Sequence, residues 1–575
     1  MFGTWTRRHA AMPAFALAVL ALAACGGNDD DDNPSPTPLP QLSPATPATF
    51  GGDCATLAAA LTGLANTTIT AVSTVAAGTQ VGGLAVAEHC LVTGHMHERI
   101  STVDGQTYAI GFELRLPKAW NGRFFYQANG GIDGTVVPAT GSFGGGPLTH
   151  ALHQGFAVLS SDAGHPGSMG PNFGLDPQAR LDYGYQAVAK LTPMAKEAIR
   201  RVYGKGPDRS YIGGCSNGGR HAFVAASRYA QDYDGILAGA PGFNLPRAAV
   251  ANIFGAQRYA TVATNPADLS TAFTAQERQT VAQAVLTRCD ALDGATDALV
   301  QDTTACQSTF DLFRDVPTCG SGGRDGTCLT AEQKTAISPI FAGARTSGGA
   351  AVYASFPYDS GLGASGIAFW EFMAPLMLDS AAVGLIFKAP PENPATFNGP
   401  NFALTTSIDA MVQYIQSTDA VYTEPAMSFM TPPDPTDLST LKNRGGKMLV
   451  YHGVSDPIFS VDDTTAWYEG LRTRHGDDAS RFARFFRVPG MGHCSGGPAT
   501  DQFDVLTPLV QWVEHGVAPD RIIAKARGAG SPGGVNPELP ATWASDRSRP
   551  LCPYPRVARY RGTGSLEDEA SFACE

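Results

Sequence analysis

A serine between two glycines is the first residue of this chain that could do covalent chemistry. Ser216 lies in the stretch 214–218, Gly-Cys-Ser-Asn-Gly, after a short apolar run and before a helix-like run. Strand, sharp turn and helix in this order are typical of a nucleophile elbow. The glycines suit the tight turn, where a Cβ would clash. We predict that Ser216 is a nucleophile, although glycine-rich turns that contain a serine are common.

A serine hydroxyl attacks poorly unless a neighbouring base takes its proton. His493 lies in a glycine-rich loop after the strand-like run 485–488, and Asp456 follows the strand-like run 447–452. Serine, acid and histidine in this order are typical of α/β-hydrolases. We therefore predict a triad of Ser216, Asp456 and His493. Asp462 and Asp463 compete for the acid role, but they lie further from the strand and are expected to open a helix. Taken alone, Asp456 before a proline could be a turn residue, and His493 a loop histidine.

The oxyanion formed by such an attack needs preorganised hydrogen-bond donors. The backbone N–H of the residue after the nucleophile, Asn217, is the first expected donor. The second should come from a loop after an earlier strand. Gly131, in the turn after the strand-like run 123–126, meets that condition, although a plain glycine turn would look the same.

Cysteines flank both ends of the predicted triad: Cys215 precedes Ser216, and Cys494 follows His493. This arrangement suggests a disulfide that ties nucleophile to base. Ten cysteines remain when Cys25 is set aside, and an even set in an exported chain implies disulfides. Because no Cys-x-x-Cys pair is present, zinc is discounted. Proximity along the chain suggests the other pairs: Cys54–Cys90, Cys289–Cys306, Cys319–Cys328 and Cys552–Cys574.

The segment 289–299 places three carboxylates in one short loop with a turn-forming glycine. Unneutralised, these carboxylates would repel one another, and Ca²⁺ with oxygen ligands suits such a flexible loop. The spacing is not that of an EF-hand, and the alternative is an acidic solvated turn. We predict a structural Ca²⁺ site closed by the pair Cys289 and Cys306, with these ligands: Asp290, Asp293, Ala295, Asp297 and Leu299.

Strand-like and helix-like stretches alternate between residues 90 and 240, and the alternation resumes at 447. Alternation of this kind favours a mostly parallel sheet covered on both faces. The intervening segment is expected to carry irregular loops and to form a lid over the sheet edge. The predicted parts are a signal (1–25), a flexible linker (26–50), the first part of an α/β-hydrolase core (51–244), a lid with the calcium site (245–440) and the second part of the core (441–575).

The composition excludes several classes of protein. With 43% hydrophobic and 16% charged residues among 575, the chain can build a sizeable core. A net charge of −12 without a basic stretch makes nucleic acid an improbable partner.

The N-terminus has the pattern of an export signal, with two arginines before an apolar run. That run ends in Leu-Ala-Ala-Cys at Cys25, which resembles a bacterial lipoprotein box; simple secretory cleavage is the alternative. We expect a lipid on Cys25 and a location in the periplasm, at the outer membrane or in the medium.

The pairing of Cys-Ser with His-Cys around an intervening Asp closely resembles the tannase and feruloyl esterase family, as does the Cys-Asp-x-x-Asp-Gly-x-x-Asp loop. Within the family the likeness is greatest to bacterial mono(2-hydroxyethyl) terephthalate hydrolases, in the stretches 121–125, 173–180 and 549–555. The resemblance covers nearly the whole chain after the linker. It implies an α/β-hydrolase with a lid, five disulfides, one lid calcium, and the triad, oxyanion and calcium residues named above.

The chain departs from the terephthalate pattern at three positions. Such hydrolases carry a lid arginine for the free carboxylate and a lid phenylalanine that stacks on the ring. The corresponding positions are Ala374 and Leu378, and Asn217 stands where those enzymes have Glu. Trp370 or Phe369 could still form an aromatic wall, although core packing is an equal alternative.

Together these residues predict an exported serine carboxylesterase that acts on small esters of aromatic acids, as a monomer. Feruloyl or related hydroxycinnamoyl esters are the first expectation; a terephthalate monoester or a tannin is the alternative. A remoter alternative is a non-catalytic surface lipoprotein, against which the intact triad residues argue. A metallohydrolase is disfavoured because His89, His95, His97 and His165 lack a metal-ligand spacing.

Overall fold

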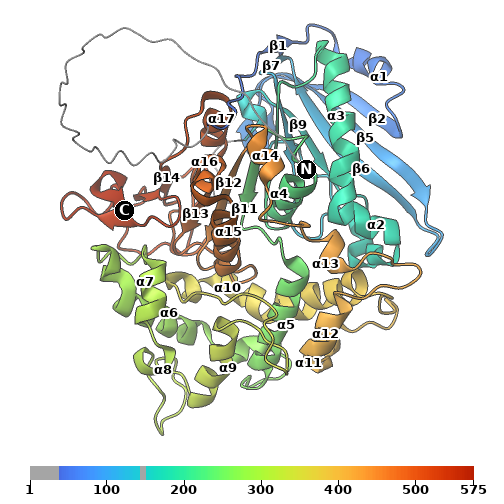
Figure 1. Ribbon diagram of the computed structural model, residues 1–575. Coiled ribbons are helices and arrows are strands. Elements are labelled where there is room, and N and C mark those ends of the chain that lie inside the picture. The colour runs from blue at the N-terminus through green and yellow to red at the C-terminus, as the bar shows by residue number, and fades with distance from the viewer. Residues whose placement is uncertain (1–37, 143–149) are drawn as a thin grey trace, which may run out of the picture. The chain divides into compact units, whose positions relative to one another are not determined.

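The computed structural model describes residues 38–142 and 150–575, and Leu39–Glu575 form one compact unit. Its centre is a nine-stranded sheet (Figure 1). The sheet is parallel over its first six strands and antiparallel over the last three, which confirms the predicted α/β-hydrolase class. In spatial order the strands are β13 (Ala483–Val488), β12 (Lys447–Gly453), β11 (Gly235–Gly239), β10 (Arg209–Cys215), β8 (Arg123–Gln127), β9 (Ala157–Ser161), β6 (Thr107–Pro117), β5 (His89–Ile100) and β2 (Thr67–Val75).

Both faces of the parallel part are buried, and alternate residues of each strand enter different cores. In β8, Phe124 and Tyr126 join one hydrophobic cluster and Phe125 joins another. This follows from the two-residue period of a strand. The first cluster is completed by α3 (Ala187–Tyr203), α4 (Asn217–Arg228) and α15 (Val461–His475), and the second by α17 (Leu506–His515).

The three antiparallel strands are the part of the sheet that the sequence analysis did not identify. β5 and β6 are long and pair with each other over most of their length. One strand of this part, β2, is mostly exposed or half-buried, with polar residues on both faces, so its hydrophobic pattern is weak. Four further two-stranded sheets pair β1 (Ala48–Thr49) with β7 (Ala119–Trp120), β3 (Gln80–Val81) with β4 (Leu84–Ala85), β14 (Ile522–Lys525) with β15 (Ser548–Leu551), and β16 (Ala558–Tyr560) with β17 (Phe572–Cys574).

The segment between β11 and β12 is helical, where irregular loops were expected. Most of its helices gather below the sheet in Figure 1 and form a hydrophobic cluster to which core residues such as Tyr183 and Phe459 also belong. Most are short, and several contain or begin with proline, so a clear helical period is absent from the sequence. They are α5 (Leu245–Ala260), α6 (Ala275–Cys289), α7 (Thr303–Thr309), α8 (Leu312–Asp315), α9 (Ala331–Phe341), α10 (Ser365–Ala368), α11 (Gly399–Thr405), α12 (Ile408–Tyr414), α13 (Ala426–Phe429) and α14 (Ser439–Asn443).

One continuous helix of this layer runs from Ser365 to Phe387, through α10 and several π-helical turns. Among the described residues it is the one helix long and apolar enough to cross a membrane, judged by length and composition alone. Its buried side chains, such as Phe372 and Ile386, belong to the hydrophobic cluster of this layer. We call this segment the lid helix.

The remaining helices are α1 (Leu57–Ala60) and α2 (Pro177–Leu181), which precede α3, and α16 (Ala479–Phe482), which precedes β13. The closing helix α17 begins at Leu506. Part of the predicted linker packs on the core: β1 pairs with β7, and the backbone N–H of Ala45 donates to Glu514. The signal and Cys25 lie outside the described residues.

Candidate active site

Ser216 lies at a sharp turn between β10 and α4. Its backbone has φ 66° and ψ −127°, a conformation that L-residues rarely adopt and that is typical of strained functional turns. A Cβ at Gly214 or Gly218 would collide with the carbonyl oxygen of Ala128. Both glycines are therefore required for the turn to approach the neighbouring strand end, as expected of a nucleophile elbow.

The structure brings Ser216, His493 and Asp456 into one hydrogen-bonded chain, although they come from three separate strand ends. His493 Nε2 lies 2.8 Å from Ser216 Oγ, and His493 Nδ1 lies 2.7 Å from Asp456 Oδ2. Because the carboxyl ends of β10, β12 and β13 meet at one edge of a parallel sheet, the loops after them converge there. The competing acids are engaged elsewhere: Asp462 accepts from Ser355, and Asp463 accepts from Asn244.

The Asp456 carboxyl is fully enclosed. Burial raises its pKa, but the charge and hydrogen bonds of His493 and His452 outweigh burial and hold the pKa well below its usual range. Backbone N–H groups of Ile458 and Phe459 also donate to Oδ1. The carboxylate is thus ionised at neutral pH and can hold the His493 ring in one orientation.

A disulfide joins Cys215 to Cys494, across 279 residues of chain. It connects the residue before Ser216 with the residue after His493. The other four pairs are also those expected: Cys54–Cys90, Cys289–Cys306, Cys319–Cys328 and Cys552–Cys574.

Two backbone segments meet beside the nucleophile. An ideal Cβ at Gly130 would lie 3.8 Å from Ser216 Cβ, and Gly131 follows with φ +64°. The side chain of Asn217 donates to Asp133 over 2.7 Å, which ties the loop of Gly131 to the start of α4. Asp133 was not predicted from the sequence, because an acid in a glycine turn carries no signal of its own.

A cavity of about 750 Å³ opens beside the hydrogen-bonded residues Ser216 and His493. Ser216 and His493 line it, together with Gly131, Asn217 and Trp370. Trp370 stands edge-on to the His493 ring, with ring centroids 5.1 Å apart. The two expected aromatic residues differ here: Phe369 does not line the cavity but packs against Trp370 and is 41% exposed. Of the two lid positions that depart from the terephthalate pattern, Leu378 lines the cavity and Ala374 is buried outside it.

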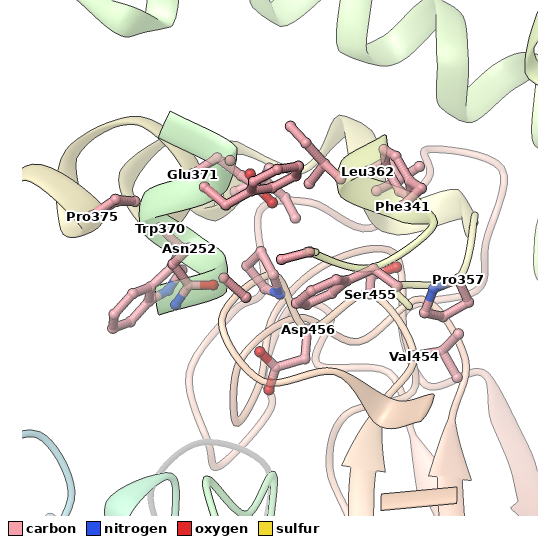
Figure 2. Close-up of a pocket in the computed structure, with 18 residues that line it drawn as sticks. Asn252, Phe341, Pro357, Leu362, Trp370, Glu371, Pro375, Val454, Ser455 and Asp456 are labelled. Atoms are coloured by element: carbon pink, nitrogen blue, oxygen red, sulfur yellow. The ribbon is translucent and has the colours of Figure 1, made fainter. Parts of the chain in front are cut away.

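A second, small cavity of about 30 Å³ lies where the lid meets the core. Figure 2 shows Asp456 on one side of it and Glu371 of the lid helix on the other. Burial raises the pKa of Glu371 to about 7, and Tyr259 donates a hydrogen bond to its carboxyl. This space has room for little more than a water molecule. The lid is therefore closely packed against the loop that carries Asp456.

A lid aspartate also contacts the loops that carry His493 and Asp456. Asp359 is fully buried and accepts from Ser455 Oγ over 2.5 Å and from the backbone N–H of Gly490 over 2.8 Å. This residue carries no signal in the sequence, since it lies 96 residues from Ser455 and 131 residues from Gly490. It shows that the lid helps to position the two loops.

The acidic loop after α6 has features of a cation site. Asp293 Oδ2 and Asp297 Oδ1 are buried without a hydrogen-bond partner in the described part of the chain. The Asp290 carboxylate accepts backbone N–H groups across the loop, and Asp297 also pairs with Arg549. Within residues 38–142 and 150–575, no three His, Cys, Asp or Glu side chains are grouped as a ready metal site. Buried carboxylate oxygens are costly when unpaired, so the two orphaned oxygens fit a hard cation.

Comparison with known proteins identifies the family to which the chain belongs. A family model described as "Tannase and feruloyl esterase" matches residues 90–575. The chain belongs to this family. A mono(2-hydroxyethyl) terephthalate hydrolase of Piscinibacter sakaiensis is 39% identical over 536 residues, which cover 87% of each chain. A probable feruloyl esterase B-1 of Neosartorya fischeri is 29% identical over 86% of this chain and 88% of its own.

Solved structures agree with the fold. Feruloyl esterase B from Aspergillus oryzae superposes with a TM-score of 0.70 at 25% identity, over 90% of this chain and all of that one. A tannin acyl hydrolase from Aspergillus niger superposes with a TM-score of 0.68 at 21% identity, over 92% of this chain and 96% of that one. The chain is thus a member of a family of carboxylic ester hydrolases, as predicted.

Proposed function

We propose that this protein is an exported serine carboxylesterase that hydrolyses small esters of hydroxycinnamic and related aromatic acids. The observation that carries the proposal is the hydrogen-bonded chain Ser216–His493–Asp456 at the wall of a cavity lined by Trp370. An aromatic side chain beside the base suits a planar acyl group.

In the proposed reaction, Ser216 Oγ attacks the ester carbonyl while His493 Nε2 takes its proton. The N–H groups of Gly131 and Asn217 hold the negative oxygen of the tetrahedral intermediate. The carbon–oxygen bond to the alcohol then breaks, and His493 returns the proton to the leaving alcohol. Water, activated by His493, cleaves the acyl-enzyme and releases the acid and free Ser216. Asp456 stabilises the imidazolium throughout.

A terephthalate monoester is the second candidate substrate, favoured by the 39% identity to the Piscinibacter sakaiensis enzyme. Its free carboxylate would enter a cavity in which none of the described lining residues is Lys or Arg. A charge buried without a partner is costly, so we place neutral aryl esters first. A tannin-type gallate ester, which is neutral, stays a third candidate.

Hydrolysis of methyl ferulate, methyl gallate and mono(2-hydroxyethyl) terephthalate by purified protein tests the assignment. We expect the highest kcat/KM for methyl ferulate, and a loss of about 10⁴-fold or more in Ser216→Ala. Absence of turnover for all three esters would refute the proposal. If the monoester gave the highest kcat/KM, the second candidate would replace the first.

We also propose that Ca²⁺ binds the loop after α6, through carboxylates of Asp290, Asp293 and Asp297 and the carbonyl groups of Ala295 and Leu299. The two orphaned carboxylate oxygens support this. When bound, the ion would neutralise like charges and stiffen a loop that Cys289–Cys306 already closes.

Export is the remaining part of the proposal. Five disulfides in the described part of the chain suit an oxidising compartment. The lipid on Cys25 and the monomeric state remain predictions from the sequence.

A further inference from the structure

Asp379 is a carboxyl group in the wall of the active cavity that the proposed reaction does not use. It lies on the lid helix and lines the same cavity as Ser216 and His493. Its side chain is buried, with 4% of the residue exposed, and Oδ2 has no hydrogen-bond partner among the residues that the structure describes. A buried, unpaired polar atom is costly, so its presence at a ligand cavity calls for a partner that is absent from the free protein.

Burial raises the pKa of Asp379 to about 8, and a hydrogen bond from Asn252 opposes that shift only in part. No Lys or Arg is found among the described residues that line the cavity. The other carboxyl there, Asp133, already accepts hydrogen bonds from Asn217 and His221. At neutral pH Asp379 is therefore mostly a neutral acid, with one O–H donor and free acceptor capacity.

We propose that Asp379 is a specificity-determining residue, which hydrogen-bonds a neutral hydroxyl group on an aromatic ring of the ester. This inference rests on the proposed esterase function. The other lid-helix residues that line the cavity are Trp370, Leu378 and Ala382, so Asp379 is the carboxyl that this helix offers to a ring hydroxyl. An ester without the hydroxyl would leave the buried carboxyl unpaired, which a site built for a hydrogen bond penalises.

The hydroxyl could belong to the acyl part or to the alcohol part of the ester, and two substrate series separate these sources. In the acyl series, kcat/KM is compared for methyl 4-hydroxycinnamate and methyl cinnamate. In the alcohol series, it is compared for 4-hydroxybenzyl acetate and benzyl acetate. For wild type we expect a preference of about tenfold or more for the hydroxylated member of one series, as one hydrogen bond to a buried group can supply.

Asp379→Leu should reduce that preference to about one, and the series in which it does so identifies the side of the ester. Asp379→Asn keeps a donor and an acceptor of the same size and should retain most of the preference. Glu371→Gln is the matched control: Glu371 is a buried carboxyl on the same helix that does not line the active cavity, and the preference should not change.

A structural role alone would lower kcat/KM for both members of a series equally. An unchanged preference in Asp379→Leu, or no preference in wild type in either series, would therefore overturn the inference while leaving the esterase function intact. If Asp379→Leu fails to fold, Asp379→Ala offers the same comparison. Absence of turnover for all four esters by wild type would instead contradict the proposed function.

Discussion

Cys215 and Cys494 form a disulfide with their Cα atoms 6.1 Å apart, and each half-cystine neighbours one member of the Ser216–His493 pair. The disulfide thereby restrains the distance between the strained turn at Ser216 and the loop of His493. A misplacement of a base by about 1 Å can cost about 100-fold in rate, so this restraint bears directly on catalysis.

Replacement of both cysteines by serine should lower kcat by about 10–100-fold and the free energy of unfolding by about 2–5 kcal/mol. Ester hydrolysis and thermal unfolding measure the two effects. Cys319→Ser with Cys328→Ser is the matched control, because that disulfide closes a short lid loop whose cysteines do not line the cavity. Unchanged kcat in the first double variant would refute a role in positioning.

Asp359 should be a positioning residue. Asp359→Ala leaves Ser455 Oγ and the N–H of Gly490 without their acceptor, and these belong to the loops of Asp456 and His493. We expect kcat to fall about tenfold, with KM little changed, and stability to fall by about 1–3 kcal/mol. Ser355→Ala removes another hydrogen bond between lid and core and should leave kcat unchanged. Equal kcat in both variants would contradict this role.

Calcium removal should act on stability before it acts on chemistry. Without the ion, the negative charges on the unpaired carboxylate oxygens of Asp293 and Asp297 would repel each other. We expect excess EDTA to lower the free energy of unfolding by about 1–2 kcal/mol, which is a Tm shift of about 1–2 °C in a chain of this length, and added Ca²⁺ to restore it. Asp293→Asn should remove the response to both. A wild-type Tm that is insensitive to EDTA and to Ca²⁺ would refute the site.

The carboxyl group of Glu371, a half-buried residue, should make stability depend on pH. Burial raises its pKa from 4.5 to about 7, so between these values the folded protein binds more protons than the unfolded chain. Stability from this group is therefore greatest below pH 4.5 and falls as the pH rises through 7. Relative to wild type, Glu371→Gln should lose less stability between pH 5 and pH 8, by up to about 3 kcal/mol in urea unfolding. Parallel pH profiles would show that the carboxyl does not titrate in this range.

The sequence predicted the parts of the site that local motifs mark. Ser216, Asp456 and His493 each follow an apolar strand, and their loops meet because parallel strands end at one edge. The cysteines beside Ser216 and His493 gave a second, independent indication that these two residues lie close together. The short spacing between neighbouring cysteines also predicted which cysteines pair in the lid.

The residues that the sequence did not reveal act across long stretches of chain. Asp359 and Asp379 are ordinary aspartates in weakly patterned lid segments, and only the packed lid places them at the two loops and the cavity. Strand β2 was missed because it is exposed or half-buried and lacks a continuous apolar run, whereas β5 and β6 alternate buried with half-buried residues, a two-residue period that the sequence does carry. Most lid helices were missed because they are short, and α9 also contains a proline.

Covalent labelling of Ser216 tests the central claim most directly. A fluorophosphonate reacts with a serine only when a base activates the hydroxyl, and its phosphonyl group stays on the Oγ atom from which water would release the acyl group of a substrate. Intact-mass measurement after labelling should show one adduct, mapped to Ser216, with complete loss of ester hydrolysis; Ser216→Ala should show neither adduct nor hydrolysis. Full ester hydrolysis by Ser216→Ala, or an adduct on another residue that accounts for the lost activity, would contradict the account.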